Sequence, residues 1–392
     1  MKGRAFDIVV LGATGYTGRV IVNDLLAVNK NLNWAIAGRS EAKLRSLWQA
    51  IGNKVPKLIF DVFDRSSLNR ITKETKLIIN CVGPYSLFGE SVVRSCVENG
   101  THYIDVSGEP LFLEKTQLNF HEEALRRNVF VIGSCGFDSL PADLAVCLVK
   151  KRSPEIKSIE TFLTTHYESK FRFNLGTWES LVFGFANYQQ LKEVRKQLFA
   201  DFEAYPSDRK ALRKIEGKFV IPFLGSDRSV IKRTQLLNNK YFATKVVPVE
   251  TYFVCLSKLQ LFSLFTMISL ITPLSRFKGG RSLLMKHPRI FSFGMTGVPM
   301  LTEEEMSKAS FEMRVNAHHF DESLSRVKIT GPEAGYKTAS ICCIQSALTL
   351  LNEHHNIPLP GGVLTPGFAF QNTKIISNLS NYNIKFEFTK TK

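Results

Sequence analysis

Residues 9–18 read VVLGATGYTG, and this stretch decides the fold, because an apolar run ends in three glycines that lie three residues apart. A strand that enters such a turn and leaves it as a helix brings backbone N–H groups close to a pyrophosphate. The spacing is GxxGxxG rather than GxGxxG, and a glycine triplet alone is a weak signal. Its place between a first strand and a first helix favours a dinucleotide-binding turn over a scaffold that has lost its ligand.

The first 140 residues alternate short β-branched runs with helical patterns, which is typical of a parallel sheet built from right-handed crossovers. The six predicted strands are residues 7–11, 33–37, 57–60, 77–81, 103–106 and 129–133. The pattern changes at residues 159–167, where apolar and polar side chains alternate as in a half-exposed antiparallel strand. The predicted fold class is therefore α/β, with an amino-terminal Rossmann parallel sheet followed by a second, α+β domain.

The domain limits are placed where these patterns change. Residues 1–149 form the predicted NAD(P)-binding domain, and a boundary is expected near residues 149–155. Residues 150–336 form the α+β substrate domain, with strands expected at 219–223 and 244–249. Residues 337–392 contain an apolar helix and then a loop rich in Pro and Gly, and we expect this segment to pack back on the Rossmann domain.

The composition is that of an ordinary globular protein, with 44% apolar and 22% charged residues in a chain of 392. The seven cysteines form no CxxC pair, and the amino terminus lacks the long apolar stretch of a signal peptide, so we expect an intracellular protein with reduced thiols. His166, His318, His319, His354 and His355 lack ligand spacing with nearby Cys, Asp or Glu, and we predict no metal site.

The positive charge is concentrated in the middle of the chain. Residues 150–300 hold 25 Lys and Arg against 11 Asp and Glu, and residues 251–301 contain no acidic residue at all. Within that run the apolar segment 252–277 has an uncharged centre, 261–274, which is too short to cross a bilayer as a helix. A lipid-facing anchor whose Lys and Arg meet anionic headgroups is one interpretation, and a buried helical hairpin is the other. Nucleic acid is disfavoured, because the basic residues flank aliphatic runs rather than base-stacking aromatics.

The second predicted strand ends in AGRS, residues 37–40. An NAD-specific site places an acidic residue here to accept from the ribose 2′-hydroxyl, whereas Arg39 with Ser40 suits a 2′-phosphate. NADP is therefore the expected cofactor, and a surface arginine with relaxed cofactor choice is the alternative. Asp61 ends the third strand, where it could bind the adenine amino group. Residues 80–84, NCVGP, end the fourth strand on the nicotinamide side.

The group that moves a proton is not evident from the sequence. Polar residues follow the strands near the expected nicotinamide edge, and the catalytic candidates among them are Tyr85, Cys135 and Asp138. His102, Asp105 and Glu109 lie in the same region. Structural roles are the alternative for each: Asp105 and Glu109 could cap the helix that follows Pro110, Cys135 could be a small core residue, and Asp138 with Ser139 could cap the next helix.

With these residues in view, the chain resembles the saccharopine dehydrogenase-like oxidoreductases along nearly its whole length. The segments that carry the resemblance are GATGYTG (12–18), WAIAGRS (34–40), NCVGPYSLFG (80–89), YIDVSGEP (103–110), GFDSLPAD (136–143), GPEAGY (331–336) and GGVLTPG (361–367). GFDSLPAD and GPEAGY are uncommon strings, so the resemblance is specific.

The resemblance implies a role for individual residues. The pyrophosphate would be surrounded by Gly12, Thr14, Gly15, Tyr16, Thr17 and Gly18. Arg39 and Ser40 would bind the 2′-phosphate. The ribose and nicotinamide would lie along Asn80, Val82, Gly83 and Pro84, and the substrate side would be lined by Ser134, Cys135, Gly136 and Asp138.

The resemblance also implies a place and a substrate class. Animal members of the family reside on lipid droplets and associated membranes, and bacterial relatives include enoyl reductases that act in trans on glycolipid precursors. We therefore expect an NADP-dependent oxidoreductase with a lipid or lipid-linked substrate. The alternative is a catalytically silent NADPH-binding scaffold of the lipid-droplet surface. A homodimer is a further expectation, and lysine metabolism is not expected, because no arginine cluster for a dicarboxylic amino acid lies beside GFDSLPAD.

Overall fold

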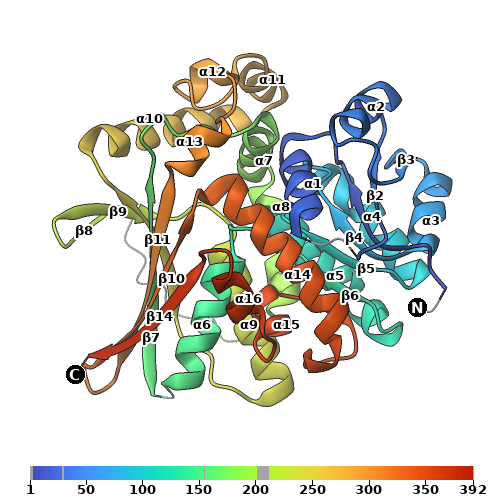
Figure 1. The fold of residues 1–392 in the computed structure, drawn as a ribbon. Helices are drawn as coiled ribbons and strands as arrows, with labels where there is room; N and C mark the ends of the chain where they lie inside the picture. The colour runs from blue at the N-terminus through green and yellow to red at the C-terminus, as the bar shows by residue number, and fades with distance from the viewer. Residues whose placement is uncertain (1–2, 29–30, 154, 201–211, 392) are drawn as a thin grey trace.

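Two seven-stranded sheets organise the chain in a computed structural model, which describes residues 3–28, 31–153, 155–200 and 212–391. The first sheet lies on one side of the molecule and the second on the other, and one long helix, α14 (Ala339–Glu353), runs between them (Figure 1). The predicted fold class, a Rossmann parallel sheet with a second mixed domain, is confirmed.

The first sheet has the order β13-β6-β5-β4-β1-β2-β3, and every pair in it is parallel. Its strands are β1 (Phe6–Leu11), β2 (Trp34–Gly38), β3 (Lys57–Ile59), β4 (Thr75–Asn80), β5 (His102–Asp105), β6 (Phe130–Ile132) and β13 (Gly362–Leu364). The helices that alternate with them are α1 (Tyr16–Val28), α2 (Glu41–Ala50), α3 (Arg65–Glu74), α4 (Tyr85–Asn99), α5 (Pro110–Arg126) and α6 (Leu140–Arg152).

The sequence pattern missed two features of this sheet. The seventh strand, β13, comes from the far carboxyl-terminal region and pairs with β6. Its three residues lie inside the loop rich in Pro and Gly, where no strand period is visible. Helix α5 begins at Pro110, seven residues before the helix expected near residue 117, because a proline is well accommodated in the first turn of a helix.

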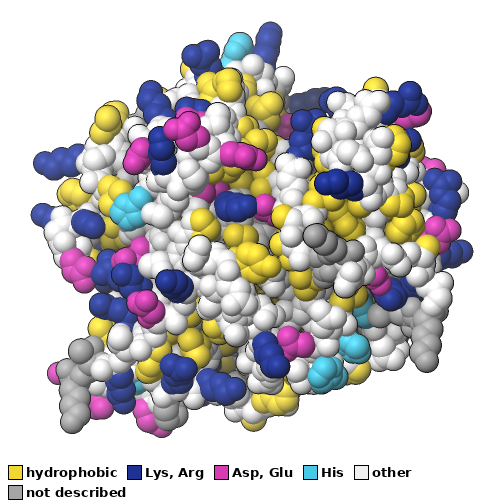
Figure 2. Space-filling view, viewed as in Figure 1, with side chains coloured by type: hydrophobic (Ala, Val, Ile, Leu, Met, Phe, Trp, Pro, Cys, Tyr) yellow, Lys and Arg dark blue, Asp and Glu magenta, His cyan; other side chains and the backbone are white. Residues whose placement is uncertain are grey.

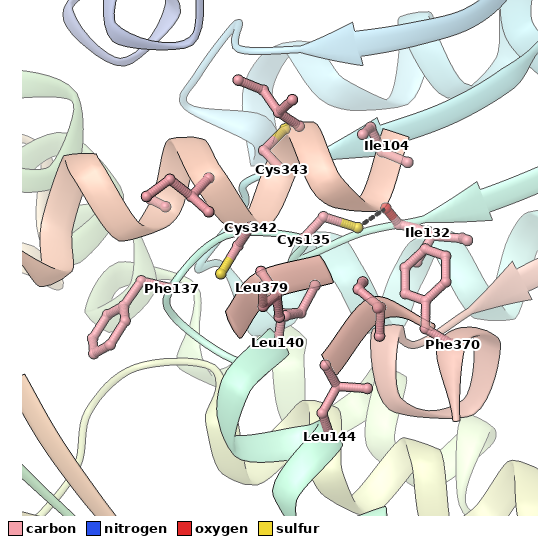
Figure 3. Close-up of a cluster of buried hydrophobic side chains, with 14 of the residues drawn as sticks. Ile104, Ile132, Cys135, Phe137, Leu140, Leu144, Cys342, Cys343, Phe370 and Leu379 are labelled. Carbon is pink, nitrogen blue, oxygen red and sulfur yellow. Dashed lines mark hydrogen bonds between the residues drawn. The ribbon is translucent and has the colours of Figure 1, made fainter. Parts of the chain in front are cut away.

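Successive side chains of β1 enter two different hydrophobic clusters. Ile8 and Val10 pack in one cluster with Ile344 of α14, whereas Val9 and Leu11 pack in the other with residues of α4 and α5. A strand that is buried on both faces reads as a continuous apolar run, which is the run seen in the sequence. Helix α14 also contacts α1, β4 and β5, and its Cys343 lies in the cluster shown in Figure 3.

The second sheet has the order β14-β12-β11-β7-β10-β9-β8, and all its pairs are antiparallel except β7 with β10. Its strands are β7 (Ile156–His166), β8 (Arg213–Ile215), β9 (Lys218–Pro222), β10 (Val249–Cys255), β11 (Ser310–His319), β12 (Leu324–Pro332) and β14 (Lys385–Thr391). Helices α6 and α9 (Asp227–Phe242) pack against strands of this sheet, so α6 serves both halves of the molecule.

Two predictions about the middle of the chain are wrong. The strand expected at residues 244–249 begins only at Val249. The apolar segment predicted to start at residue 252 is not one lipid-facing unit, because its first four residues belong to β10, which is paired on both sides by β7 and β9. Tyr252, Val254 and Cys255 are therefore buried in the sheet.

A group of helices lies at one end of the molecule, at the top of Figure 1. It consists of α7 (Leu175–Ala186), α10 (Lys258–Ser275), α11 (Lys278–Lys286), α12 (Pro288–Phe291) and α13 (Glu303–Ser307). Trp178, Met267, Ile271 and Leu284 form a small hydrophobic core of their own there, and the Trp178 indole donates a 3.1 Å hydrogen bond to the Leu284 carbonyl. The remaining helices are α8 (Tyr188–Leu198), η1 (Ala334–Thr338), η2 (His354–Asn356), α15 (Pro366–Phe370) and α16 (Ile375–Ser380).

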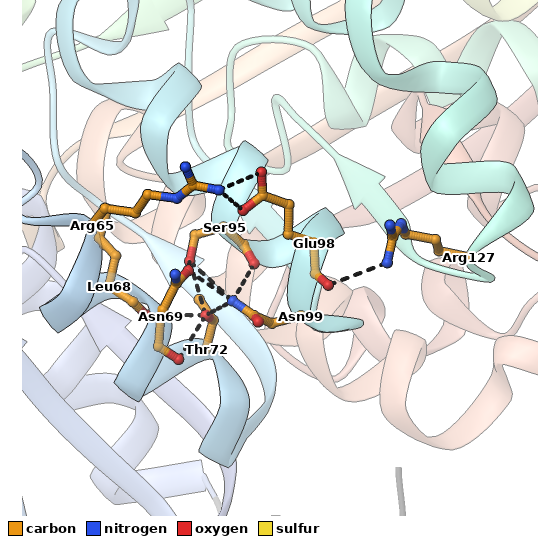
Figure 4. A network of polar contacts seen from close by, with 8 residues as sticks. All are labelled: Arg65, Leu68, Asn69, Thr72, Ser95, Glu98, Asn99 and Arg127. Carbon is orange, nitrogen blue, oxygen red and sulfur yellow. Dashed lines mark hydrogen bonds and ion pairs between the residues drawn. The ribbon is translucent and has the colours of Figure 1, made fainter.

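A polar network joins α3 to α4 on the outer side of the Rossmann sheet (Figure 4). The Asn99 side-chain amide donates 2.9 Å hydrogen bonds to Asn69 Oδ1 and Thr72 Oγ1. Arg65 forms an exposed ion pair with Glu98 at 2.9 Å. Because these side chains are mostly uncharged and partly buried, the contacts between the two helices depend little on ionic strength.

The last part of the chain divides between the two sheets, since β13 joins the first and β14 joins the second. The domain limits at residues 149 and 336 stay predictions.

Ile344→Ala tests how strongly α14 holds the Rossmann sheet. Ile344 is 1% exposed in the core cluster, so the truncation should lower the free energy of unfolding by about 2–5 kcal/mol, as measured by urea denaturation. The matched control is Leu259→Ala, whose side chain is 74% exposed and whose loss should cost less than about 0.5 kcal/mol. Equal losses for the two variants would contradict this packing.

Candidate functional site

The glycine turn is shaped by backbone contacts that exclude a side chain at two positions. A β-carbon on Gly18 would lie 2.3 Å from the Gly12 carbonyl oxygen, and one on Gly12 would lie 2.9 Å from the Cys81 backbone. Gly12 also has a positive φ of 74°. Gly15 is exposed and meets only the Gly12 oxygen, so its backbone is open at the amino terminus of α1. This geometry fits a pyrophosphate-binding turn.

Tyr16 connects this turn to the second half of the molecule. Its hydroxyl donates a 3.2 Å hydrogen bond to the Leu301 carbonyl, and its ring packs edge-on against Tyr336 with centroids 4.6 Å apart. Tyr336 belongs to η1, a single turn of π-helix within the GPEAGY motif. The buried Glu333 carboxylate caps that turn by accepting the N–H groups of Gly335, Tyr336 and Lys337. The GPEAGY motif is therefore in direct contact with the glycine turn.

The predicted adenosine-side residues lie at the ends of β2 and β3. The Arg39 side chain is exposed at the end of β2. The Ser40 hydroxyl caps α2 by accepting from the Lys43 N–H at 3.4 Å. Asp61 is exposed, and its Oδ1 accepts the Phe63 N–H at 2.9 Å. Arg39 is thus the group whose charge is open to a ligand phosphate.

The predicted nicotinamide side is built on the buried Asn80 at the end of β4. Its Oδ1 accepts the Val82 N–H at 3.0 Å, and its Nδ2 donates to the Tyr103 hydroxyl at 3.1 Å. These bonds fix the backbone of residues 80–84, in which the Gly83–Pro84 peptide bond is cis. The Tyr85 hydroxyl donates back to the Asn80 carbonyl at 2.9 Å.

Asp105 connects the loops after β5 and β6, and through Tyr103 it also reaches Asn80 at the end of β4. Its carboxylate accepts the N–H groups of Ser107 and Ser134 at 2.9 and 2.8 Å and the Tyr103 hydroxyl at 2.8 Å. Burial raises the pKa of Asp105 to about 6. The expectation that Asp105 caps the helix after Pro110 is wrong, because its carboxylate accepts from Tyr103 of β5 and from the loops after β5 and β6.

Glu109 likewise has a role that the sequence did not indicate. Its carboxylate accepts the N–H groups of Tyr85 and Ser86 at 2.9 Å, so it caps α4 rather than its own helix α5. The Ser180 hydroxyl of α7 donates to the same carboxylate at 2.6 Å. Glu109 therefore links the loop after β4 to a helix of the second domain.

The three catalytic candidates lie in different surroundings. The Cys135 thiol is fully buried, donates to the Ile132 carbonyl at 3.3 Å and points into the core cluster (Figure 3). Tyr85 is buried against Phe112, and burial raises the pKa of its hydroxyl well above the ordinary value. Asp138 is partly exposed, and burial raises the pKa of its carboxyl to about 6. Asp138 is the candidate whose side chain is open to a substrate.

The expectation that Asp138 and Ser139 cap α6 is wrong. Ser139 stands at the cap position but its side chain makes no capping bond, and its φ of 113° is a strained conformation for a residue with a side chain. The Ser139 hydroxyl instead bonds that of Ser226 at 2.9 Å.

Asp143, the second acidic residue of GFDSLPAD, is buried and hydrogen-bonded to neighbouring helices. Its Oδ2 accepts the Thr234 hydroxyl of α9 and the Gly367 N–H of α15, both at 2.7 Å. Burial raises the pKa of this carboxyl to about 6. The motif thus places one aspartate, Asp143, at a packed helix junction and another, Asp138, among the candidate site residues.

The comparisons with known proteins agree with this architecture. The family model of the saccharopine dehydrogenase NADP binding domain matches residues 8–132. The chain is 35% identical to the saccharopine dehydrogenase-like oxidoreductase of Bos taurus, over 98% of this chain and 97% of that protein. It is 32% identical to the lipid droplet localized protein of Caenorhabditis elegans, over 97% of this chain and 98% of that protein.

Two more distant matches cover a shorter region or the fold alone. A putative trans-acting enoyl reductase of Mycobacterium tuberculosis is 30% identical over 53% of this chain and 51% of that protein. The apo saccharopine dehydrogenase (L-Glu forming) of Saccharomyces cerevisiae has a TM-score of 0.57 at 15% identity, covering 99% of this chain and 100% of that one. The second match concerns the fold only.

The fold and the matched domain define an NADP-binding Rossmann oxidoreductase, so the predicted cofactor is confirmed. The chain belongs to the saccharopine dehydrogenase-like oxidoreductase family, as its motifs indicated. Among the described residues no group of three or more His, Cys, Asp or Glu is arranged to hold a metal ion.

Asp143→Asn tests the structural role of this buried carboxyl through pH. Because its pKa is raised to about 6 in the folded protein, the proton contributes stability that is full below about pH 4 and is lost as the pH rises through 6. The asparagine keeps the neutral form, so at about pH 8 it should raise the free energy of unfolding by up to roughly 3 kcal/mol, and at about pH 4 by nearly nothing. Urea denaturation at both pH values measures the difference. A gain that is equal at both would contradict the raised pKa.

Proposed function

We propose that this protein is an NADP-dependent oxidoreductase that acts on a lipid or lipid-linked substrate at the surface of a lipid droplet or membrane. The observation that carries the lipid part is an apolar, basic surface on α10, α11 and α12, of which α10 and α11 pack on α7, and α7 in turn contacts Glu109 at the site. The enoyl-reductase relative supports reduction of an activated double bond, as in glycolipid metabolism. The lipid droplet name of the nematode relative supports the location.

The lipid-facing surface, as we call it, consists of large apolar side chains that project from α10 to α12 and the turns after them. Leu259 and Phe262 of α10 are 74% and 69% exposed. The other exposed members are Phe265, Leu270, Phe277, Leu283, Ile290 and Phe293. An exposed apolar patch of this kind on a water-soluble chain indicates an interaction site. The end of the molecule where these helices lie carries hydrophobic and basic side chains next to one another (Figure 2).

The charges around this surface favour an anionic lipid partner. Lys258, Arg276, Lys278, Lys286 and Arg289 lie on the same helices and turns, and residues 251–301 contain no Asp or Glu. Lys and Arg beside a lipid-inserted apolar face gain energy from anionic phospholipid, on the order of 1 kcal/mol for each charge near the surface. The surface therefore suits an anionic phospholipid layer better than an acidic protein partner, which would not require exposed aromatic side chains.

Helix α10 is better suited to lie in the lipid interface than to cross a bilayer. Of the described helices it alone is long and apolar enough for a span, with 18 residues. Its inner face, through Met267 and Ile271, packs against Trp178 of α7. A helix held on one face by the protein and exposed on the other is an interfacial helix. The alternative of a wholly buried hairpin does not agree with the exposure of Leu259 and Phe262.

The site residues fit the proposed cofactor as follows. The turn at residues 12–18 would hold the pyrophosphate, Arg39 the 2′-phosphate and residues 80–84 the nicotinamide side, with Asp61 near the adenine. NADPH, when bound, supplies the hydride. The chain orients the substrate and excludes water, and Asp138 is the residue we assign to proton transfer. Tyr85 and Cys135 stay weaker candidates because of their burial.

A scaffold protein of the lipid-droplet surface that binds NADPH without turnover is the second candidate function. The lipid-facing surface favours the scaffold function, because binding to a lipid layer does not require catalysis. The partly exposed Asp138, which makes no hydrogen bond or ion pair with the described residues, favours the enzyme, since a scaffold has no use for such a carboxyl. The homodimer stays a prediction.

Arg39→Ala tests the 2′-phosphate assignment. Loss of the guanidinium should weaken NADPH binding by at least about tenfold and change NADH binding by less than about twofold, because only NADPH carries the 2′-phosphate. A fluorescence titration of the purified protein measures both affinities. Arg45→Ala is the matched control, since Arg45 is exposed on α2 and pairs with Glu41. An equal loss for both nucleotides would contradict the assignment.

Leu259→Ser combined with Phe262→Ser tests the lipid-facing surface. Removing two large exposed apolar side chains should weaken binding to phosphatidylcholine vesicles that contain phosphatidylserine by about tenfold or more, as measured by vesicle flotation. The circular dichroism spectrum and NADPH affinity should not change. Phe63→Ser serves as the control, because Phe63 is 72% exposed on the Rossmann side. Vesicle binding that survives the double substitution would refute the surface.

A further inference from the structure

Two carboxyl groups from different halves of the molecule, one partly exposed and one buried, lie close together at the edge of the site. Asp138 lies in the loop between β6 and α6, and Asp227 is the first residue of α9. The two loops are tied together beside these residues by the 2.9 Å hydrogen bond between Ser139 Oγ and Ser226 Oγ. Ser139, which follows Asp138 in the chain, has a strained φ at this junction. The sequence singled out Asp138 and gave no sign of Asp227.

Glycines leave room for the Asp138 carboxyl. A β-carbon on Gly108, in the loop after β5, would lie 3.3 Å from Asp138 Oδ2. A β-carbon on Gly225, just before α9, would lie 3.3 Å from the same oxygen. The carboxyl therefore sits between two backbone segments that carry no side chain. Such an arrangement brings Asp138 close to the loop after β5, at the carboxyl-terminal edge of the Rossmann sheet where the nicotinamide end of a dinucleotide lies.

Neither carboxyl forms an ion pair with a basic side chain in the part of the chain that the structure describes. Asp227 is 2% exposed, and its Oδ1 has no hydrogen-bond partner. Asp138 makes no hydrogen bond or ion pair with the described residues. Two arginines of α9 have other partners: Arg228 binds Glu250 at 3.0 Å, and Arg233 binds Gln117.

A third acidic residue, Asp143, also acts on Asp227 through its charge. Burial raises the pKa of Asp227 well above its ordinary value, and the charges of Asp138 and Asp143 raise it further. Burial alone raises the pKa of Asp138 to about 6. Two adjacent carboxyls without a cation cannot both ionise cheaply, so near neutral pH one of them keeps its proton.

We propose that Asp138 and Asp227 form a carboxyl pair that holds one proton at the nicotinamide end of the site and gives it to the substrate. This inference rests on the proposed oxidoreductase function. The O–H bond of the carboxyl breaks, a new bond from the proton to a substrate carbon or oxygen forms, and the pair is left with one more negative charge. The two electrons of the reduction come with the hydride of the reduced nicotinamide. Asp138 touches the substrate, and Asp227 is a positioning residue that stores the proton.

Infrared spectroscopy tests whether the pair is protonated. A carboxyl that keeps its proton at about pH 7.5 shows a C=O stretching band that ionised carboxylates lack, and ordinary Asp and Glu are ionised there. The band should be present in the wild-type protein and absent from Asp227→Asn. Asp143→Asn should retain it and is the matched control, because Asp143 is equally buried but bound to Thr234 and Gly367. Absence of the band in the wild type, or its survival in Asp227→Asn, overturns the proposal.

Calorimetry then tests where the proton lies relative to the cofactor. The oxidised nicotinamide ring is positively charged, so binding of NADP⁺ next to the pair should release about half a proton, whereas binding of NADPH should release almost none. Titrations in two buffers with different ionisation enthalpies measure this release. Asp138→Asn and Asp227→Asn should abolish it and leave NADPH affinity within about twofold of the wild type.

The two measurements separate the two levels of inference. NADP⁺ binding without proton release, or release that persists in both variants, overturns the carboxyl pair and leaves the oxidoreductase assignment standing. If neither nucleotide binds, the proposed function fails and with it the donation to a substrate, whatever the infrared band shows.

Discussion

The buried carboxylate of Asp105 is the constraint on which the site depends. It accepts hydrogen bonds from the loops after β5 and β6, and through Tyr103 it also holds Asn80 at the end of β4. The loops that carry the nicotinamide-side and catalytic candidates are therefore fixed to one side chain in the core. Because a buried carboxylate without such donors would be very costly, the three loops cannot move independently of one another.

The Rossmann half could be predicted from the sequence because its signals are local. The contact between Gly18 and the Gly12 carbonyl allows no side chain, and the strands read as apolar runs because both faces of the sheet are covered. The contacts that complete the site are not local. Glu109 caps a helix that begins 24 residues earlier in the chain, and Asp227 lies 89 residues after Asp138. No period or spacing in the sequence predicts these long-range contacts, because they depend on how the second sheet packs on α6 and α9.

In the second half of the molecule, too, the sequence could not predict which residues are exposed. Composition identified a basic and apolar region, but it did not separate Tyr252, which is buried in the middle of β10, from Leu259, which is exposed on α10. Both are large apolar residues in one continuous run. The difference arises because β10 is paired on both sides, whereas α10 has a partner on one face only. Pairing is a property of the assembled sheet, so the exposed residues could be assigned only after the fold was known.

A continuous series of contacts joins the lipid-facing surface to the site. Helix α10 packs on α7 through Ile271 and Trp178. The Ser180 hydroxyl of α7 donates a hydrogen bond to the Glu109 carboxylate. Glu109 in turn binds the first two N–H groups of α4, which follow the loop at residues 80–84. Each contact is buried or partly buried, so a shift of α7 would change the hydrogen bonds of Glu109 and thereby the start of α4. The apolar helices and the loop at residues 80–84 are therefore parts of one packed unit. The surface segment has little direct contact with the Rossmann core, but α7 and Glu109 connect it to the candidate site.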